Sequence, residues 1–309
     1  MRLVYFDIPA GNFGDDLNRF LWPRLLPGAF SGVTRIPMYH PTEQGPPGED
    51  LFLSMGTVIM ARVPASGPRL VFGSGAGYDR LPTIDENWQF HFVRGPLTAE
   101  RLGLDPKLAI SDPATLVRLL PPPAREKAHR LSFMPHWLMA ETGAWQQICH
   151  ALDIHFIDPR WPPIRVLRNI AETETLITEA LHGAVVANAL RVPWMAVSSG
   201  DAVLPFKWND WCRTIGVAYA PAAIPAIWKR RKGLKSHLIM AAKTIAAELA
   251  LARIARHPRP ILSADGVVER LTERMVEVLG AFCSARHLRL NLSPQYGREP
   301  VADELLESV

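Results

Sequence analysis

A histidine in the middle of the chain lies where a short apolar run gives way to an alanine-rich segment. We expect a strand to end at Thr178 and a helix to begin directly after it, which places His182 in the first helical turn. That turn carries N–H groups without intrahelical partners and the positive end of the helix dipole. Such surroundings lower the pKa of a histidine and favour a bound anion. We therefore predict a functional role for His182, with Glu179 and Gly183 beside it.

An acidic, glycine-containing loop follows the first predicted strand and opens a helix at residues 11–18. Glycines let the backbone approach a ligand, but the adjacent Asp15 and Asp16 would repel a phosphate. Carboxylates suit hydrogen bonding to sugar hydroxyls, or general-base work on one of them. The alternative is an Asp helix cap next to a glycine turn. The residues predicted here to bind such a sugar are Asn12, Gly14 and Asn18.

Three further side chains stand where predicted strands or helices begin or end. Arg94 ends a strand just before a helix that starts with proline, where a guanidinium can hold a phosphate or carboxylate; the alternative is a surface salt bridge. His136 follows another strand and is a candidate acid, or else an ordinary core or surface residue. Lys207 could close a phosphate site, whereas the nearby Asp210 is interpreted as a helix cap.

The elements that position these residues are short apolar runs ended by Gly, Pro or Asp. Runs of this length suit strands that are buried on both faces of a parallel sheet. Helix-like stretches lie between the runs, which predicts an α/β fold. The strands are expected at 3–6, 51–54, 70–72, 90–93, 108–110, 131–134, 175–178 and 194–197, and the helices at 17–26, 97–102, 180–190 and 236–256, with another after Asp265.

A run of three prolines followed by charged residues, at 120–127, is the best candidate for a linker between domains. It divides the chain into an N-terminal α/β domain at 1–120 and a second α/β domain at 128–220. Residues 221–309 are expected to form a basic helical extension with a polar tail. No internal repeat is visible in the sequence.

Composition narrows the class of protein. The 309 residues carry a net charge of +4, but residues 229–260 hold nine Lys or Arg and one acid, so the basicity belongs to one segment. We therefore expect no nucleic-acid partner. Three dispersed cysteines, no zinc-ligand spacing, no signal peptide and no long apolar run predict a cytoplasmic protein without a metal.

The order of these motifs resembles the polysaccharide pyruvyltransferase family. GNFGDD near the N-terminus, VRGPLT, SDPA, the strand-end His136, LHGAVVANALRVPW and KWNDW follow one another over residues 8–217. The likeness is to the exopolysaccharide ketal-pyruvate branch, of the succinoglycan and xanthan type. Many relatives have Arg two residues before the motif histidine, where this chain has Ala180 preceded by Glu179.

The resemblance implies two Rossmann-like domains that face each other across a cleft, as in a glycosyltransferase-B-like fold. It further implies phosphoenolpyruvate as donor, no cofactor, and a lipid-linked oligosaccharide of an exopolysaccharide as acceptor. The acceptor side is then the domain at 1–120 and the donor side the domain at 128–220. His182 lies at the donor site, where Glu179 and Gly183 are also expected to bind the donor. Lys207 is assigned to the phosphate, and Arg94 could hold the carboxylate. His182 or His136 would act as general acid and Asp15 or Asp16 as base.

A lipid-linked acceptor fits the basic segment, whose residues 229–259 could contact an anionic membrane at the cytoplasmic face. The helix predicted there shows no clean apolar stripe, because Leu249 shares a side with Arg253. Packing against the N-terminal domain is therefore the alternative. Two other functions stay open, namely a nucleotide-sugar glycosyltransferase of the same fold and a catalytically silent sugar-binding relative.

Overall fold

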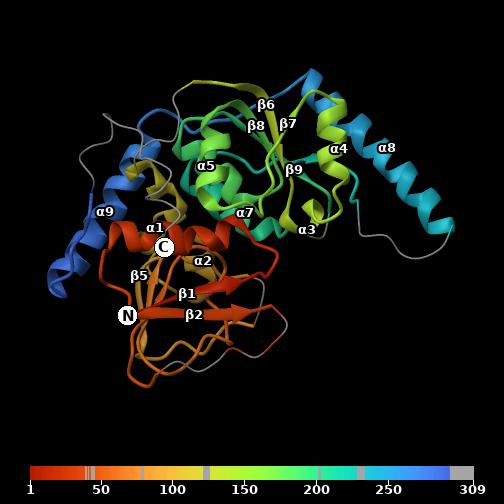
Figure 1. The fold of residues 1–309 in the computed structure, drawn as a ribbon. Helices are drawn as coiled ribbons and strands as arrows, with labels where there is room; N and C mark the ends of the chain where they lie inside the picture. Colours follow the sequence, from red (N-terminus) through yellow and green to blue (C-terminus); the bar gives the residue numbers. More distant parts are fainter. Residues whose placement is uncertain are drawn as a thin grey trace. The chain divides into compact units, whose positions relative to one another are not determined.

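The computed structural model describes residues 1–38, 40, 42, 46–77, 80–120, 126–200, 203–227 and 234–292, with the backbone alone for 234–238. Two compact units make up the chain (Figure 1). The first comprises 1–122, 204–218 and 263–309, and the second comprises 123–203 and 219–262. Each unit is an α/β structure built on one parallel sheet, as the apolar runs predicted.

The first unit contains five parallel strands in the order β2-β1-β3-β4-β5. Register places Leu3 of β1 opposite Val33 of β2 and Phe52 of β3. Stacked rings of Phe52, Phe72 and His91 lie side by side across β3, β4 and β5. The strands are β1 Arg2–Asp7, β2 Gly32–Pro37, β3 Leu51–Leu53, β4 Arg69–Phe72 and β5 Trp88–Phe92. The helices are α1 Phe13–Leu25, α2 Pro96–Leu102, the 3-10 turns Pro106–Leu108 and Pro113–Leu119, α7 Pro205–Thr214 and α9 Val267–Ala285.

The second unit also contains five parallel strands, in the order β10-β9-β8-β6-β7. Its core joins Phe133, Trp145 and Ile177 to Ala247 and Leu251 of the basic helix. The strands are β6 His129–Met134, β7 His155–Phe156, β8 Thr173–Thr178, β9 Trp194–Ser198 and β10 Ala222–Ala223. The helices are α3 Trp137–Ala140, α4 Ala144–Ala151, α5 Pro163–Ala171, α6 Leu181–Ala189 and α8 Leu234–Arg256.

The two sheets share one topology, although no repeat is visible in the sequence. In each sheet the first strand along the chain lies between the second and the third: β1 between β2 and β3, and β6 between β7 and β8. The chain therefore runs from β1 to one side of the sheet and from β3 to the other side, and it does the same from β6 and β8. Open α/β sheets bind ligands at the carboxyl ends of such a pair.

The units differ from the predicted domains in two places. The chain passes from the first unit to the second between residues 122 and 123, which is inside the predicted linker at 120–127. Residues 121–125 of this linker lie outside the described residues. Helix α7, expected in the second domain, belongs to the first unit because it packs on α2, and α9 belongs there as well. Helix α8, by contrast, packs on α4 of the second unit.

Some elements also differ from the sequence-based expectation. The strand expected at 108–110 is a 3-10 turn at Pro106–Leu108 followed by a single bridge from Ala109 to Val93. Strands β2, β7 and β10 were not predicted, because they are edge strands with partly exposed side chains. Among the described helices, none has both the length and the apolar character needed to cross a lipid bilayer.

Candidate active site

In the second unit, two predicted residues meet at the carboxyl ends of β6 and β8. His136 follows β6 and Glu179 follows β8, and the N–H of His136 donates to Oε2 of Glu179 at 3.1 Å. The N–H of Ser199, just after β9, donates to Oε1 of the same carboxylate at 2.6 Å. Glu179 is 1% exposed. One buried carboxylate thus ties together the loops that follow three neighbouring strands.

This geometry corrects the donor-binding role predicted for Glu179. Both carboxylate oxygens already accept backbone N–H groups, and a buried negative charge would repel a phosphate or a carboxylate. Glu179 is instead a positioning residue. It holds the loop of His136, which is 8% exposed, beside the start of α6.

Helix α6 begins at this edge without a capping side chain. Its N-cap is Ala180, whose own N–H donates to Oγ1 of Thr178 at 3.0 Å. The first N–H of α6 to point back into the helix is that of Ala184, which donates to the carbonyl of Ala180. The N–H groups of the first turn, which includes the half-buried His182, precede that bond. An uncapped helix start of this kind is suited to an anion.

Gly183 has a packing reason to be glycine. A Cβ at this position would lie 2.7 Å from Oγ1 of Thr178 and 2.9 Å from the sulfur of Met134. The first turn of α6 therefore packs directly on the ends of β6 and β8. The absence of a side chain serves this contact, and any part in donor binding would come from the backbone N–H.

In the first unit, the acidic loop lies at the corresponding strand pair, after β1. The N–H of Asn12 donates to Oδ2 of Asp16 at 3.0 Å, and Nδ2 of Asn12 donates to Asp15 at 2.5 Å. Burial raises the pKa of Asp16, and the nearby Asp7 adds to this, whereas the bond from Asn12 and the charge of Arg19 lower it. Asp15 is 8% exposed, whereas Asp16 is half-buried, so Asp16 is the more accessible of the two carboxylates.

Asn18 does not reach an acceptor, contrary to the prediction. It is fully buried, and its amide donates to the carbonyls of Asp15 and Met55 while its oxygen accepts the N–H of Met55. Asn18 thus fastens α1 to the loop that follows β3. Gly14 is likewise buried in the first turn of α1. Both residues are therefore buried supports of the acidic loop.

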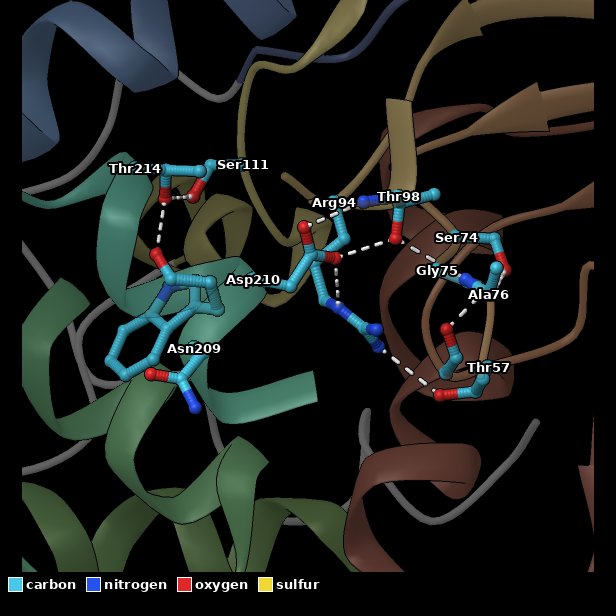
Figure 2. A network of polar contacts seen from close by, with 12 residues as sticks. Thr57, Ser74, Gly75, Ala76, Arg94, Thr98, Ser111, Asn209, Asp210 and Thr214 are labelled. Atoms are coloured by element: carbon cyan, nitrogen blue, oxygen red, sulfur yellow. Dashed lines mark hydrogen bonds and ion pairs between the residues drawn. The ribbon is translucent and has the colours of Figure 1, made fainter. Parts of the chain in front are cut away.

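Arg94 is also engaged inside the first unit, which corrects its predicted role. Its Nε lies 3.1 Å from Oδ2 of Asp210, and Nη1 donates to Oγ1 of Thr57 (Figure 2). Arg94 and Asp210 are 1% and 0% exposed. The guanidinium lies against Gly75, where a Cβ would be 2.1 Å from Nη2. Arg94 therefore forms a buried ion pair and is not an accessible partner for a substrate carboxylate.

Asp210 caps a helix other than its own. Its Oδ1 accepts the N–H of Thr98 in the first turn of α2, and its Oδ2 accepts the hydroxyl of Thr98 at 2.6 Å (Figure 2). The N-cap of α2 is Gly95, which has no side chain to do this. A Cβ on Gly95 would lie 2.2 Å from the carbonyl of Asp210. In the sequence, the only indication that α2 needs a cap from elsewhere is that it starts at Gly95-Pro96, where no side chain can cap it.

The remaining predicted cation, Lys207, lies in the first turn of α7 in the first unit. Sequence reasoning missed another cation, Arg160, in the loop that follows β7 at the carboxyl edge of the second sheet. Its side chain is 29% exposed and pairs with Asp158 at 2.5 Å. Hydrogen bonding to Asp158 raises the pKa of Arg160.

The described parts of the chain give no support to a metal site or to a cysteine nucleophile. No group of three or more His, Cys, Asp or Glu side chains there could hold a metal ion. The three cysteines are free and buried, and burial raises the pKa of Cys149 and of Cys212 to about 12. These thiols are therefore protonated at neutral pH and poor nucleophiles.

Comparison with known proteins identifies the relatives of this chain. No family model matches it, and no solved structure matches it. The chain is 43% identical over 229 residues to the succinoglycan biosynthesis protein ExoV of Rhizobium meliloti (strain 1021), a match that covers 73% of this chain and 68% of that protein. Together with the ordered motifs, this likeness makes the chain a transferase of exopolysaccharide biosynthesis: it belongs to the succinoglycan-type polysaccharide pyruvyltransferase family.

Proposed function

We propose that this enzyme transfers the pyruvyl group of phosphoenolpyruvate to two hydroxyls of one sugar in a lipid-linked exopolysaccharide repeat unit. The observation that carries the proposal is the uncapped start of α6, with His182 in its first turn, beside the loop of His136. The glycosyltransferase-B-like arrangement expected from the sequence stays a prediction.

The donor phosphate is assigned to the start of α6. The N–H groups of the first helical turn and the helix dipole offset its charge, and His182 supplies a donor that can also be a proton source. Lys207 stays a predicted second cation for this phosphate. Because Arg94 is buried in its pair with Asp210, a donor carboxylate cannot reach it and requires another partner. We assign the carboxylate to Arg160, which lies at the same edge of the second sheet as His136 and is partly exposed, although its Nε and Nη2 also donate to Asp158.

The reaction needs one proton delivered to carbon and one leaving group. His182 or His136 protonates the methylene carbon of the donor, which makes C2 electrophilic. One sugar hydroxyl adds to C2. A second hydroxyl then displaces phosphate, which carries away the proton of that hydroxyl, so that the ketal ring closes and inorganic phosphate is released. Asp16, the more accessible carboxylate of the acidic loop, takes a hydroxyl proton; Asp15 is the alternative base.

The deciding experiment measures phosphate release from phosphoenolpyruvate in the presence of acceptor. We expect His182→Ala to lower kcat by about 10²–10⁴-fold, the usual contribution of a positioned acid. His150→Ala is the matched control, because His150 is an exposed histidine on α4 of the same unit. Near-normal release by His182→Ala would overturn the assignment.

Thermal unfolding separates the donor classes. Phosphoenolpyruvate should raise the melting temperature of the wild-type protein, and Arg160→Gln should reduce that shift because it removes the carboxylate partner. Stabilisation by uridine or guanosine diphosphate, with none by phosphoenolpyruvate, would point to a nucleotide-sugar donor instead.

A further inference from the structure

Helix α8 carries apolar side chains on two opposite faces. The inner face belongs to the core of the second unit, where Ala247 and Leu251 are fully buried and Met240 and Ile254 are partly buried. These residues follow a helical spacing and pack toward α4, which lies beside α8 in Figure 1. One stripe is enough to hold a surface helix on its domain.

The outer face repeats the apolar pattern, and its side chains are exposed in the part of the chain that the structure describes. Ala242, Ile245, Ala246 and Leu249 are spaced i, i+3, i+4 and i+7, so they form one stripe. The side chains of Ile245 and Leu249 are 59% and 67% exposed. Ile239, one turn before the stripe, is 50% exposed. Single exposed apolar residues are ordinary, but a stripe of them on one helix marks an interaction surface.

The charges around this stripe have one sign. Arg253 and Arg256 continue the outer face by one more turn, and Lys243 flanks it; all three are exposed. Glu248 is the one acid in α8, and it is partly buried. The chain segment 229–260, to which α8 belongs, holds nine Lys or Arg. The partner must therefore combine an apolar region, into which these side chains can insert, with negative charge beside it.

We propose that this outer face of α8, from Ala242 to Arg256, binds an anionic lipid surface and lies in the plane of the membrane interface. Apolar side chains enter the boundary between headgroups and acyl chains, while Lys and Arg contact the headgroups. A second copy of the chain fits less well, because a twofold interface would bring two basic faces together. The proposal is independent of which donor the enzyme uses.

The test is flotation of the full-length protein with vesicles of phosphatidylcholine, alone or mixed with phosphatidylglycerol. We expect binding to the mixed vesicles that weakens with salt. Ile245→Ser with Leu249→Ser should lower the partition coefficient at least about tenfold, from the loss of buried apolar area. Arg253→Gln with Arg256→Gln should lower it about fivefold for each cation.

Matched controls separate this surface from general stickiness. Ile84→Ser removes an exposed isoleucine of the first unit, and Arg213→Gln with Arg289→Gln removes two exposed cations outside α8; both should float like the wild type. Unchanged binding by the α8 variants, or no binding by the wild type, would overturn the proposal. So would a wild-type dimer in light scattering that the serine variant converts to monomer.

A second readout keeps the outcome apart from the donor assignment. The α8 variants should retain the thermal shift with phosphoenolpyruvate and phosphate release with a water-soluble acceptor fragment. Loss of flotation with retained donor binding supports the membrane surface by itself. A fall in the thermal stability of the serine variant without ligand would instead show that Ile245 and Leu249 are packed, which contradicts the exposed face.

Discussion

The two units use the same strand order to present opposite chemistry. In the first unit, the pair β1 and β3 ends in a loop with Asp15 and Asp16, and burial raises the pKa of Asp16. In the second unit, the pair β6 and β8 ends in the loop of His136 and in the uncapped helix α6, which carries His182. The topology therefore determines where a ligand can bind, and the loop residues determine what it can be.

The units also hold their edges together in different ways. The first closes the end of β5 with a charge pair, Arg94 and Asp210, that fastens α7 to α2. The second uses one unpaired carboxylate, Glu179, which accepts N–H groups from two loops. The first arrangement joins segments that are far apart in the sequence, whereas the second positions loops around a site.

The largest expected effect is on the stability of the first unit. Asp210→Ala leaves the guanidinium of Arg94 buried without its partner and α2 without its cap, which should lower the free energy of unfolding by about 3–5 kcal/mol. Urea unfolding measures this, with Asn209→Ala on the same helix as control. Adding Arg94→Met should recover part of the loss; equal midpoints for Asp210→Ala and the wild type would remove the contrast between the edges.

The acidic edge should respond in rate rather than in stability. Asp16→Asn keeps an oxygen for the N–H of Asn12 but removes the base, so kcat should fall about a hundredfold. Because burial raises the pKa of Asp16, the wild-type rate should fall on the acid side at a higher pH than an ordinary aspartate would give. A pH profile of kcat checks this. If Asp15→Asn shows the loss and Asp16→Asn does not, Asp15 is the base.

At the edge of the second unit, replacing one carboxylate oxygen of Glu179 should lower both the stability and the rate. Glu179→Gln presents an NH₂ group to the N–H of His136 or Ser199, and the lost charged hydrogen bond should cost about 2 kcal/mol of unfolding free energy. The rate should fall as well, because the loop of His136 shifts. Glu174→Gln, an exposed change on the same strand, should alter neither quantity. A rate loss with unchanged stability would indicate direct substrate contact by Glu179.

The smallest effect distinguishes the histidines of the two units. Burial and the charge of Arg286 lower the pKa of His91 in the first unit to about 4. The unfolded chain binds a proton at higher pH than the folded one does, so stability should fall as pH drops from about 6.5 to about 4. Partial exposure limits this to on the order of 1–2 kcal/mol. His91→Phe should lessen the fall in urea midpoints at low pH, whereas His257→Phe should not.

Much of the fold could be predicted because buried parallel strands are continuous apolar runs. The runs at 131–134 and 175–178 became β6 and β8, and the alanine-rich segment after His182 became α6. Edge strands such as β2 escaped, since Thr34 and Arg35 interrupt its apolar pattern. The run at 108–110 was misread because one apolar triplet does not distinguish a strand from a turn.

The candidate site was predicted less completely than the fold. The positions of Asp16, His136 and His182 follow from chain order, because each comes directly after a strand. The occupation of Arg94, Asn18 and Glu179 does not, since their partners Asp210, Met55 and Ser199 are distant in the sequence. A motif shows that a polar side chain lies at the end of a strand, but it does not show which groups that side chain hydrogen-bonds to.

By itself the sequence determined the α/β class, the strand-end positions of the polar residues and the membership of the family, because each depends on local pattern or on motif order. Only the tertiary structure decided that α7 belongs to the first unit, that Asp210 caps α2, and that α8 leaves Ile245 and Leu249 exposed. These depend on which surfaces are buried against each other. Burial is a property of the folded chain, so an apolar stripe reads the same in sequence whether it faces a core or water.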